Sequence, residues 1–163
     1  MGMEIERRFL VTADSWRGQG QTRRLRQGFM CVEPERTVRV RVIGDQAWLT
    51  LKSKISFVSR YEFEYPVPLA DAETMLDVMC ALKIEKNRTR IERDGRVWEV
   101  DEFFGDNSGL VLAEIELPDE DTPFDRPDWL GAEVTRDPRY TNAHLAGHAY
   151  AGWSAEERAR ILD

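Results

Sequence analysis

The stretch EIERRFLV at residues 4–11 alternates charged and apolar side chains, and this alternation decides the fold. On a β-strand the side-chain period is two, so Glu4, Glu6 and Arg8 project from one face and the apolar residues project from the other. The same spacing recurs along the chain in sets of charged residues. These sets are Arg24/Arg26, Arg39/Arg41, Lys52/Lys54, Arg60/Glu62/Glu64, Arg88/Arg90, Glu99/Asp101 and Glu114/Glu116. The pattern predicts a sheet with one charged face and one apolar face.

The strand pattern extends over most of the chain. Candidate strands are 3–11, 22–31, 36–43, 46–54, 58–66, 85–93, 96–103 and 110–117. Glycine and aspartate near residues 44–45 and 94–95 tolerate the positive φ of tight hairpin turns, so neighbouring strands are predicted to be antiparallel. Eight strands suffice to close a barrel. We therefore predict an α+β, mainly β fold, in which a closed eight-stranded antiparallel barrel encloses the charged face as a wet tunnel.

Helices are predicted to flank the barrel. Asp71 is expected to cap a helix that runs to about Leu82 and packs on the sheet. Ser154 and Glu157 form a capping box for a last helix, and shorter helical pieces are expected near 140–150 and 13–18. Because no repeat or Pro/Gly/Ser linker divides the sequence, residues 1–163 are predicted to form a single domain.

Composition excludes several classes of protein. The net charge of −7 disfavours a general nucleic-acid surface, since binding to phosphate backbones draws on positive charge. The sequence has no signal-peptide pattern at its start and no long apolar run, so we expect no membrane partner. Cys31 and Cys80 lack the spacing of a disulfide framework or zinc ribbon, which fits a reducing, cytoplasmic location.

Like charges side by side on a strand repel one another, so a ligand should neutralise them. Clustered carboxylates offer only oxygen donors, which suit a hard divalent cation such as Mg²⁺ or Mn²⁺. Clustered guanidinium and ammonium groups suit phosphate oxygens. For any single pair, an ordinary solvated sheet face is the commoner explanation. The recurrence of like-charged pairs on several strands instead favours a polyphosphate bound together with a metal.

These residues resemble the CYTH domain family, also called triphosphate tunnel metalloenzymes. EIERR at residues 4–8 looks like the N-terminal E-x-E-x-K signature, and the resemblance is greatest to the short bacterial members. It continues through RQGF at 26–29, VRVR at 38–41, LTLK at 49–52, RYEFEY at 60–65, WEVD at 98–101, AEIEL at 113–117, EVT at 133–135 and RYTN at 139–142. Nearly the whole chain is therefore covered.

The resemblance implies a tunnel that holds a triphosphate between a basic side and an acidic, metal-holding side. It also implies metal-dependent hydrolysis of a linear triphosphate, with inorganic triphosphate as the preferred substrate, Mg²⁺ or Mn²⁺ as cofactor, and a monomer or homodimer as the assembly. The implied catalytic residues are Glu4, Glu6 and Arg8, the substrate-binding residues are Arg39, Arg41, Lys52, Lys86 and Arg88, and the metal-binding residues are Glu62, Glu64, Asp101, Glu114 and Glu116.

Two positions depart from the family pattern. Arg8 stands in place of the signature lysine, and Phe29 stands where short bacterial members tend to have tyrosine. Arginine cannot relay a proton, and phenylalanine has no hydroxyl group. If the bacterial members use that lysine and tyrosine to position or deprotonate the attacking water, this chain must rely on its metal-bound water or be slow. The alternatives are an adenylyl cyclase, a thiamine triphosphatase, or a catalytically weak protein that binds polyphosphate or a nucleotide.

Overall fold

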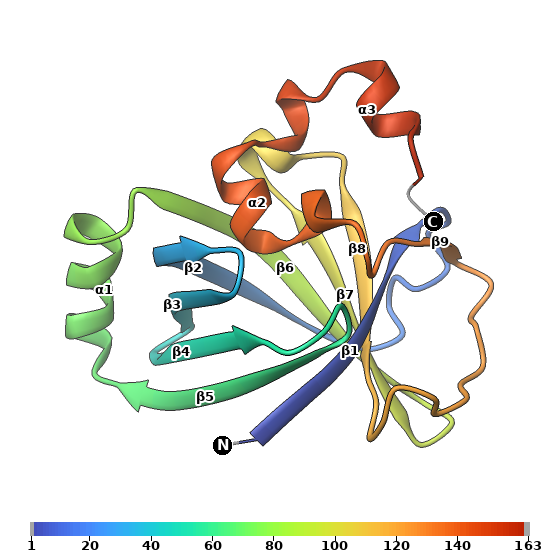
Figure 1. Cartoon of the computed structure of the whole chain (residues 1–163), viewed down its shortest axis with the longest axis horizontal. Helices are drawn as coiled ribbons and strands as arrows, with labels where there is room; N and C mark the ends of the chain where they lie inside the picture. Colours follow the sequence, from blue (N-terminus) through green and yellow to red (C-terminus); the bar gives the residue numbers. More distant parts are fainter. Residues whose placement is uncertain (1, 162–163) are drawn as a thin grey trace.

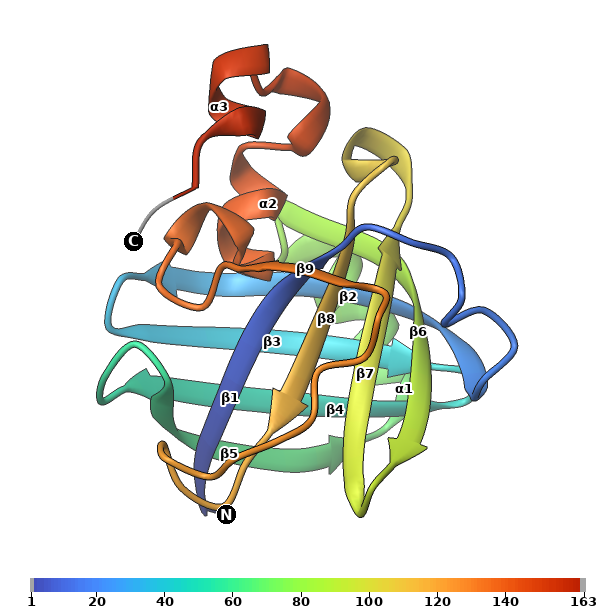
Figure 2. The same ribbon diagram turned by 90° about the vertical axis from the view of Figure 1, so that its right-hand side faces the viewer.

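The computed structural model describes residues 2–161, and its central feature is a closed β-barrel (Figures 1 and 2). Strand β5 neighbours β4, and the order continues through β3, β2, β6, β7, β8 and β1, after which β1 pairs with β5. The barrel strands are β1 Gly2–Val11, β2 Gln21–Glu33, β3 Arg36–Ile43, β4 Gln46–Lys54, β5 Ser59–Val67, β6 Leu82–Arg93, β7 Arg96–Phe103 and β8 Val111–Glu116. All of these pairings are antiparallel. The predicted eight-stranded antiparallel barrel is confirmed.

A ninth strand, β9 Leu130–Glu133, was not predicted. It pairs with the end of β1 and breaks register between Phe9 and Val11. β1 therefore has three partners. Its first residues pair with β5, residues Glu6 to Leu10 pair with β8, and its end pairs with β9. This division of β1 closes the barrel.

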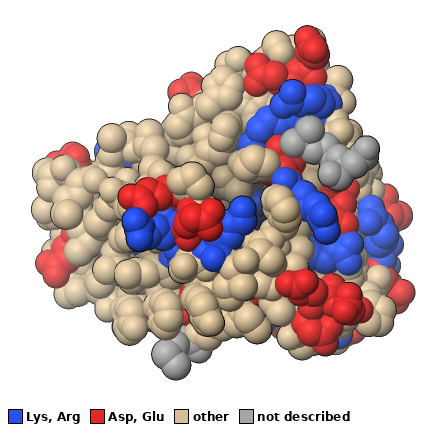
Figure 3. All heavy atoms as spheres, in the orientation of Figure 1, with Lys and Arg blue, Asp and Glu red and all other residues tan. Residues whose placement is uncertain are grey.

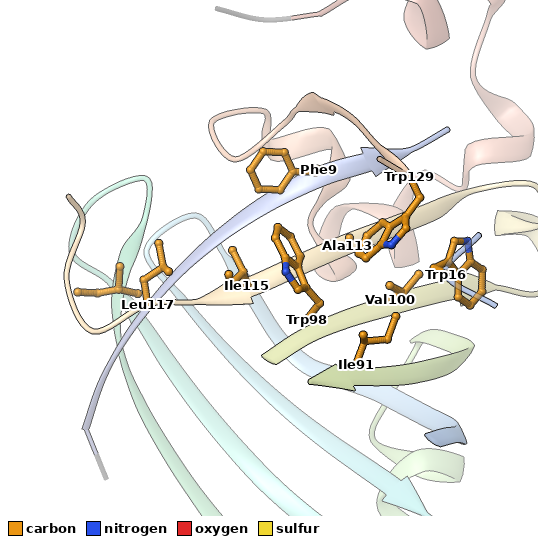
Figure 4. Packing of buried hydrophobic residues seen from close by; sticks show 10 residues of the cluster. Phe9, Trp16, Ile91, Trp98, Val100, Ala113, Ile115, Leu117 and Trp129 are labelled. Atoms are coloured by element: carbon orange, nitrogen blue, oxygen red, sulfur yellow. The ribbon is translucent and has the colours of Figure 1, made fainter. Parts of the chain in front are cut away.

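The outer face of β1, β7 and β8 carries the largest apolar core (Figure 4). Trp98 lies at its centre, with its ring 5.8 Å from that of Phe9 and 5.6 Å from that of Trp129. Trp129 and the partly buried Phe124 come from the extended segment that follows β8. This face is thus covered by an irregular segment, whereas the sequence predicted that helices would cover the apolar faces.

Helix α1, Leu69–Val78, packs on the outside of β3 and β4. Gly28 on β2 permits the close approach of the segment after the helix, because a Cβ there would lie 2.6 Å from the Cβ of Cys80. The predicted helix boundaries were wrong. Its N-cap residue is Pro68 and not Asp71, and the chain turns after Val78 so that Leu82 can begin β6. The helical piece predicted at 13–18 is a series of turns.

The C-terminal segment covers part of one end of the barrel (Figure 2). Its elements are the 3-10 helices η2 Pro138–Tyr140 and η3 Tyr150–Gly152, and the helices α2 Asn142–Gly147 and α3 Ala155–Ala159; a further 3-10 helix, η1 Gly105–Asn107, lies between β7 and β8. The predicted capping box of Ser154 and Glu157 is confirmed at α3. Leu145 is fully buried against the barrel residues Ile84 and Leu112. No helix within residues 2–161 is long and apolar enough to span a membrane.

Candidate active site

The barrel encloses a cavity of about 770 Å³ with a charged lining. The lining includes every predicted site residue except Lys86 and Asp101, namely Glu4, Glu6, Arg8, Arg39, Arg41, Lys52, Glu62, Glu64, Arg88, Glu114 and Glu116. The strand register explains this convergence, since Arg8 pairs with Glu114, Glu6 with Glu116 and Lys52 with Glu62 across neighbouring strands. Residues opposite each other in antiparallel strands share a face of the sheet. Figure 3 shows that acidic and basic groups also lie side by side on the outer surface.

One wall of the cavity is acidic, and internal cations hold its carboxylates in place. The Nζ of Lys52 lies 2.8 Å from Oε2 of Glu4 and 3.3 Å from Oε2 of Glu62. Arg60 approaches the same wall, with its Nη2 3.4 Å from Oε1 of Glu6. Lys52 thus lies between two carboxylates from different strands.

Arg8 is a buried bridge on this acidic wall. Its Nη2 lies 3.0 Å from Oε1 of Glu6, and its Nε lies 3.1 Å from Oε1 of Glu114. Burial lowers the pKa of Arg8, but the two carboxylates outweigh burial and raise that pKa above its ordinary value. Arg8 therefore stays charged and neutralises part of the wall.

Negative charge remains in excess on this wall despite these contacts. Burial, followed by the charges of Glu114 and Glu4, raises the pKa of Glu6 to about 7. Burial also raises the pKa of Glu116, and Glu4 and Glu62 raise it further. A raised carboxyl pKa means that the ionised form is disfavoured until a cation compensates it.

The acidic wall fits a divalent cation by its donor chemistry. Glu4, Glu6, Glu114 and Glu116 all line the cavity and offer only oxygen ligands, which Mg²⁺ and Mn²⁺ prefer. Within residues 2–161, no three His, Cys, Asp or Glu side chains are already gathered at the distances of a metal site. A cation at this wall would therefore replace some of the contacts that Lys52 and Arg8 now make.

The facing wall is basic, and its two arginines on β3 are poorly neutralised. The Nη2 of Arg39 lies 3.3 Å from Oγ1 of Thr50 but 3.9 Å from the nearest oxygen of Glu64, and its buried Nε has no partner among the described residues. Arg41 donates its Nε to Oε1 of Gln27 at 3.1 Å and has no ion pair within the described part of the chain. Burial, together with Arg39, lowers the pKa of Arg41 to about 9. Such uncompensated cations suit an anionic ligand.

Lys86 and Asp101 project into the barrel from the same strand faces as Arg88 and Glu99, but they do not line the cavity. Lys86 is 0% exposed, and its Nζ lies 2.6 Å from Oδ2 of Asp101 and 3.0 Å from Oδ1 of Asn142. Asp101 also accepts from Nε of Arg88 at 2.7 Å, and that arginine does line the cavity. Both side chains are occupied by these internal contacts, and the roles of Lys86 as a phosphate ligand and Asp101 as a metal ligand stay predictions.

The spacing of charges did not distinguish all interior residues from exterior ones. Arg24 and Arg26 form exposed ion pairs with Glu85 and Glu73, because on β2 the interior positions belong to their neighbours. One such neighbour, Gln27, is 1% exposed and contacts Arg41. Neither Gln27 nor Asn142 was predicted as a site residue, although both lie in stretches that resemble the family, RQGF at 26–29 and RYTN at 139–142.

The raised pKa of Glu6 predicts a specific dependence of stability on pH. A carboxyl whose pKa is higher in the folded state than its ordinary 4.5 stabilises the fold at low pH, and that contribution is lost as pH rises through the folded value of about 7. Replacing Glu6 by glutamine removes this dependence. We therefore expect the melting temperature of Glu6→Gln, relative to wild type, to be higher at about pH 8 than at about pH 5 when metal is chelated.

Scanning calorimetry at both pH values measures this difference, and any constant effect of the substitution cancels. Glu35→Gln, at an exposed residue of the cavity mouth, is the matched control and should show no such change between the two pH values. An equal melting difference for Glu6→Gln at both pH values would contradict the prediction.

Comparison with known proteins places the chain among proteins of one family. The sequence profile of the CYTH domain matches residues 2–150. A protein from Acetivibrio thermocellus named inorganic triphosphatase is 45% identical over 151 residues, which cover 92% of this chain and 97% of the relative. A second protein of that name, from Nitrosomonas europaea, is 37% identical over 147 residues, covering 88% and 96%. The crystal structure of the inorganic triphosphatase NE1496 superposes with a TM-score of 0.66 and 35% identity, covering 90% of this chain and 95% of the other.

Proposed function

The chain belongs to the CYTH domain family, and from this premise we propose that it hydrolyses a linear triphosphate, specifically inorganic triphosphate, with a divalent metal inside its barrel. The observation that carries the proposal is the pairing of two oppositely charged walls around one cavity. Arg39 and Arg41 lack sufficient negative partners, while burial and neighbouring glutamates disfavour the ionised forms of Glu6 and Glu116. A metal–triphosphate complex presents both kinds of charge at once.

The basic wall binds the phosphates. Arg39 and Arg41 donate to phosphate oxygens and stabilise the charge that spreads over them as the phosphoanhydride bond breaks. Because both side chains project from alternate positions of one strand into the same cavity, little reorganisation is required when the substrate binds. Arg88, already held by Asp101, supplies a further positive charge at the same cavity.

The acidic wall holds the metal. Glu4, Glu6, Glu114 and Glu116 are the proposed ligands, with Mg²⁺ or Mn²⁺ as the cation, and Glu62 and Glu64 flank them. When bound, such a cation neutralises phosphate charge and makes water more acidic. Lys52 becomes available to the substrate if the cation takes over its contacts with Glu4 and Glu62. Arg8 keeps the remaining carboxylates in position and stays charged throughout.

A phosphate-release assay tests the proposed activity against its alternatives. Inorganic triphosphate, ATP and thiamine triphosphate are compared with Mg²⁺, with Mn²⁺ and with chelator, and cyclic AMP is measured in parallel. We expect phosphate release from inorganic triphosphate to exceed that from the other two, and to stop when the metal is chelated. Cyclic AMP formation would show a cyclase, faster release from thiamine triphosphate would show that specificity, and binding without turnover would show a degenerate tunnel.

A separate prediction concerns the contribution of the two arginines of the basic wall to the affinity for triphosphate. Arg39→Ala and Arg41→Ala each remove a charge-assisted contact worth about 1.5–3 kcal/mol, so each should weaken triphosphate binding by about ten- to a hundredfold. Calorimetric titration in the presence of metal measures the change. Arg24→Ala is the control, because that arginine lies outside the barrel in an exposed ion pair and should leave affinity unchanged. Normal binding by either wall variant would remove that arginine from the substrate site.

A further inference from the structure

A continuous line of hydrogen bonds runs inside the barrel from the basic wall to α2 and back, and its central residue, Asn142, also lines the cavity. Gln27 accepts from Nε of Arg41 at 3.1 Å and donates its Nε2 to Oδ1 of Asn142 at 3.0 Å. The same Oδ1 accepts from Nζ of Lys86 at 3.0 Å. Asn142, the first residue of α2, thereby joins two groups from the barrel at one atom.

The bonds from Arg41 to Asn142 form the first arm of this line. The second arm leads from Asn142 through Lys86 back to the cavity. Lys86 donates to Oδ2 of Asp101 at 2.6 Å, and Asp101 accepts from Arg88 at 2.7 Å and 2.8 Å. The line therefore begins at one arginine of the cavity, Arg41, and ends at another, Arg88. Three of its middle members, Gln27, Lys86 and Asp101, are each at most 1% exposed, while Asn142 is partly buried.

Burial makes this line costly to break. A buried ammonium needs its hydrogen-bond partners, and Lys86 has only Asp101 and Asn142 among the described residues. Likewise, the amide of Gln27 bonds to Arg41 through its oxygen and to Asn142 through its nitrogen. Moving Asn142 would therefore leave groups unsatisfied on both arms.

We propose that Asn142 is a positioning residue of the triphosphatase site, because its Oδ1 ties the Arg41 arm to the Arg88 arm and so fixes these two arginines relative to each other. This inference rests on the proposed function. It gives α2 a role in substrate binding in addition to covering the end of the barrel. Small displacements of phosphate-binding groups are costly for binding and for catalysis.

The docking of α2 has supports that do not involve Asn142. Leu145 is 0% exposed in the apolar cluster at the end of the barrel. The side chain of Thr141 caps the helix by accepting from the backbone N–H of His144. The side chain of Asn142 can therefore be replaced while α2 stays capped by Thr141 and docked through Leu145.

The test compares Asn142→Ala, Asn142→Asp and Thr141→Ala in steady-state kinetics with inorganic triphosphate. Asn142→Ala is expected to raise KM about tenfold while kcat stays within about threefold, because the charge-assisted contact with Lys86 and the amide contact with Gln27 are both lost. Asn142→Asp keeps an oxygen acceptor for Lys86 and Gln27 and should restore most of the KM. Thr141→Ala loosens the helix cap but leaves the line intact, so its KM should match that of wild type.

Equal KM increases in Asn142→Ala and Thr141→Ala, or no rescue by aspartate, would overturn the proposal and reduce Asn142 to a fold-stabilising residue. If Asn142→Ala does not fold, Gln27→Met breaks the same line from the barrel side at similar volume and should raise KM in the same way. Wild-type turnover separates this test from the proposed function. An inactive wild type would refute the function, whereas an active wild type with an unaffected Asn142→Ala variant would refute only the positioning role.

Discussion

Replacing Glu4 and Glu6 together by glutamine is expected to abolish metal-dependent hydrolysis while the barrel stays folded. The change removes two charged oxygen ligands from the acidic wall. A catalytic metal supplies several kcal/mol of charge stabilisation, so its loss should lower kcat/KM by about a thousandfold or more. Folding should survive because Lys52 keeps Glu62 at 3.3 Å and Arg8 keeps Glu114 at 3.1 Å.

The measurement combines phosphate release with a calorimetric titration of Mn²⁺ and a thermal melt of the same preparation. Glu33→Gln combined with Glu35→Gln is the matched control, since it removes the same number of charges at the mouth of the cavity. The control should retain activity and Mn²⁺ binding. A Glu4/Glu6 double variant that still binds Mn²⁺ with wild-type affinity would place the metal elsewhere.

The strands of the barrel could be predicted because a period of two is a local signal. Each strand carries its alternation within its own residues, and closure was predicted because eight antiparallel strands suffice to form a barrel. β9 carries no such signal, since Leu130–Glu133 has four partly buried residues and takes its place only by pairing with the end of β1. The boundaries of α1 were missed for a related reason, because its end is fixed by the start of β6.

The site could be predicted only as far as the face of each strand could be assigned. Spacing shows that Arg24 and Arg26 share a face, but only the pairing of β2 with its neighbours shows that this face points outward. Lys86 bonds to Asn142 of α2, which is more than fifty residues away in the chain, and Lys86 in turn bonds to Asp101. Such long-range contacts leave no pattern near the residues that they bury.

Arg8 and Phe29 replace the lysine and tyrosine of the family pattern, and the structure shows what surrounds each of them. Arg8 contacts carboxylates of the acidic wall, while Phe29 on β2 lines the cavity and is paired in register with Arg39. Neither side chain can transfer a proton to or from water near neutral pH. Turnover should therefore depend on the metal and on charge stabilisation, without help from a general acid or base.

Arg8→Lys combined with Phe29→Tyr is accordingly expected to raise kcat. A lysine keeps the positive charge between Glu6 and Glu114 but can exchange a proton, and a tyrosine hydroxyl can hold water or the departing oxygen. General acid–base catalysis is typically worth about 10²–10⁴-fold, so even a partial gain of about tenfold is measurable. Steady-state kinetics of the wild type, both single variants and the double variant form a cycle that reports whether the two positions act together. A fall in kcat in all three variants would instead show that Arg8 acts as a fixed clamp, that the metal alone activates water, and that this pair of residues is a working alternative to lysine and tyrosine.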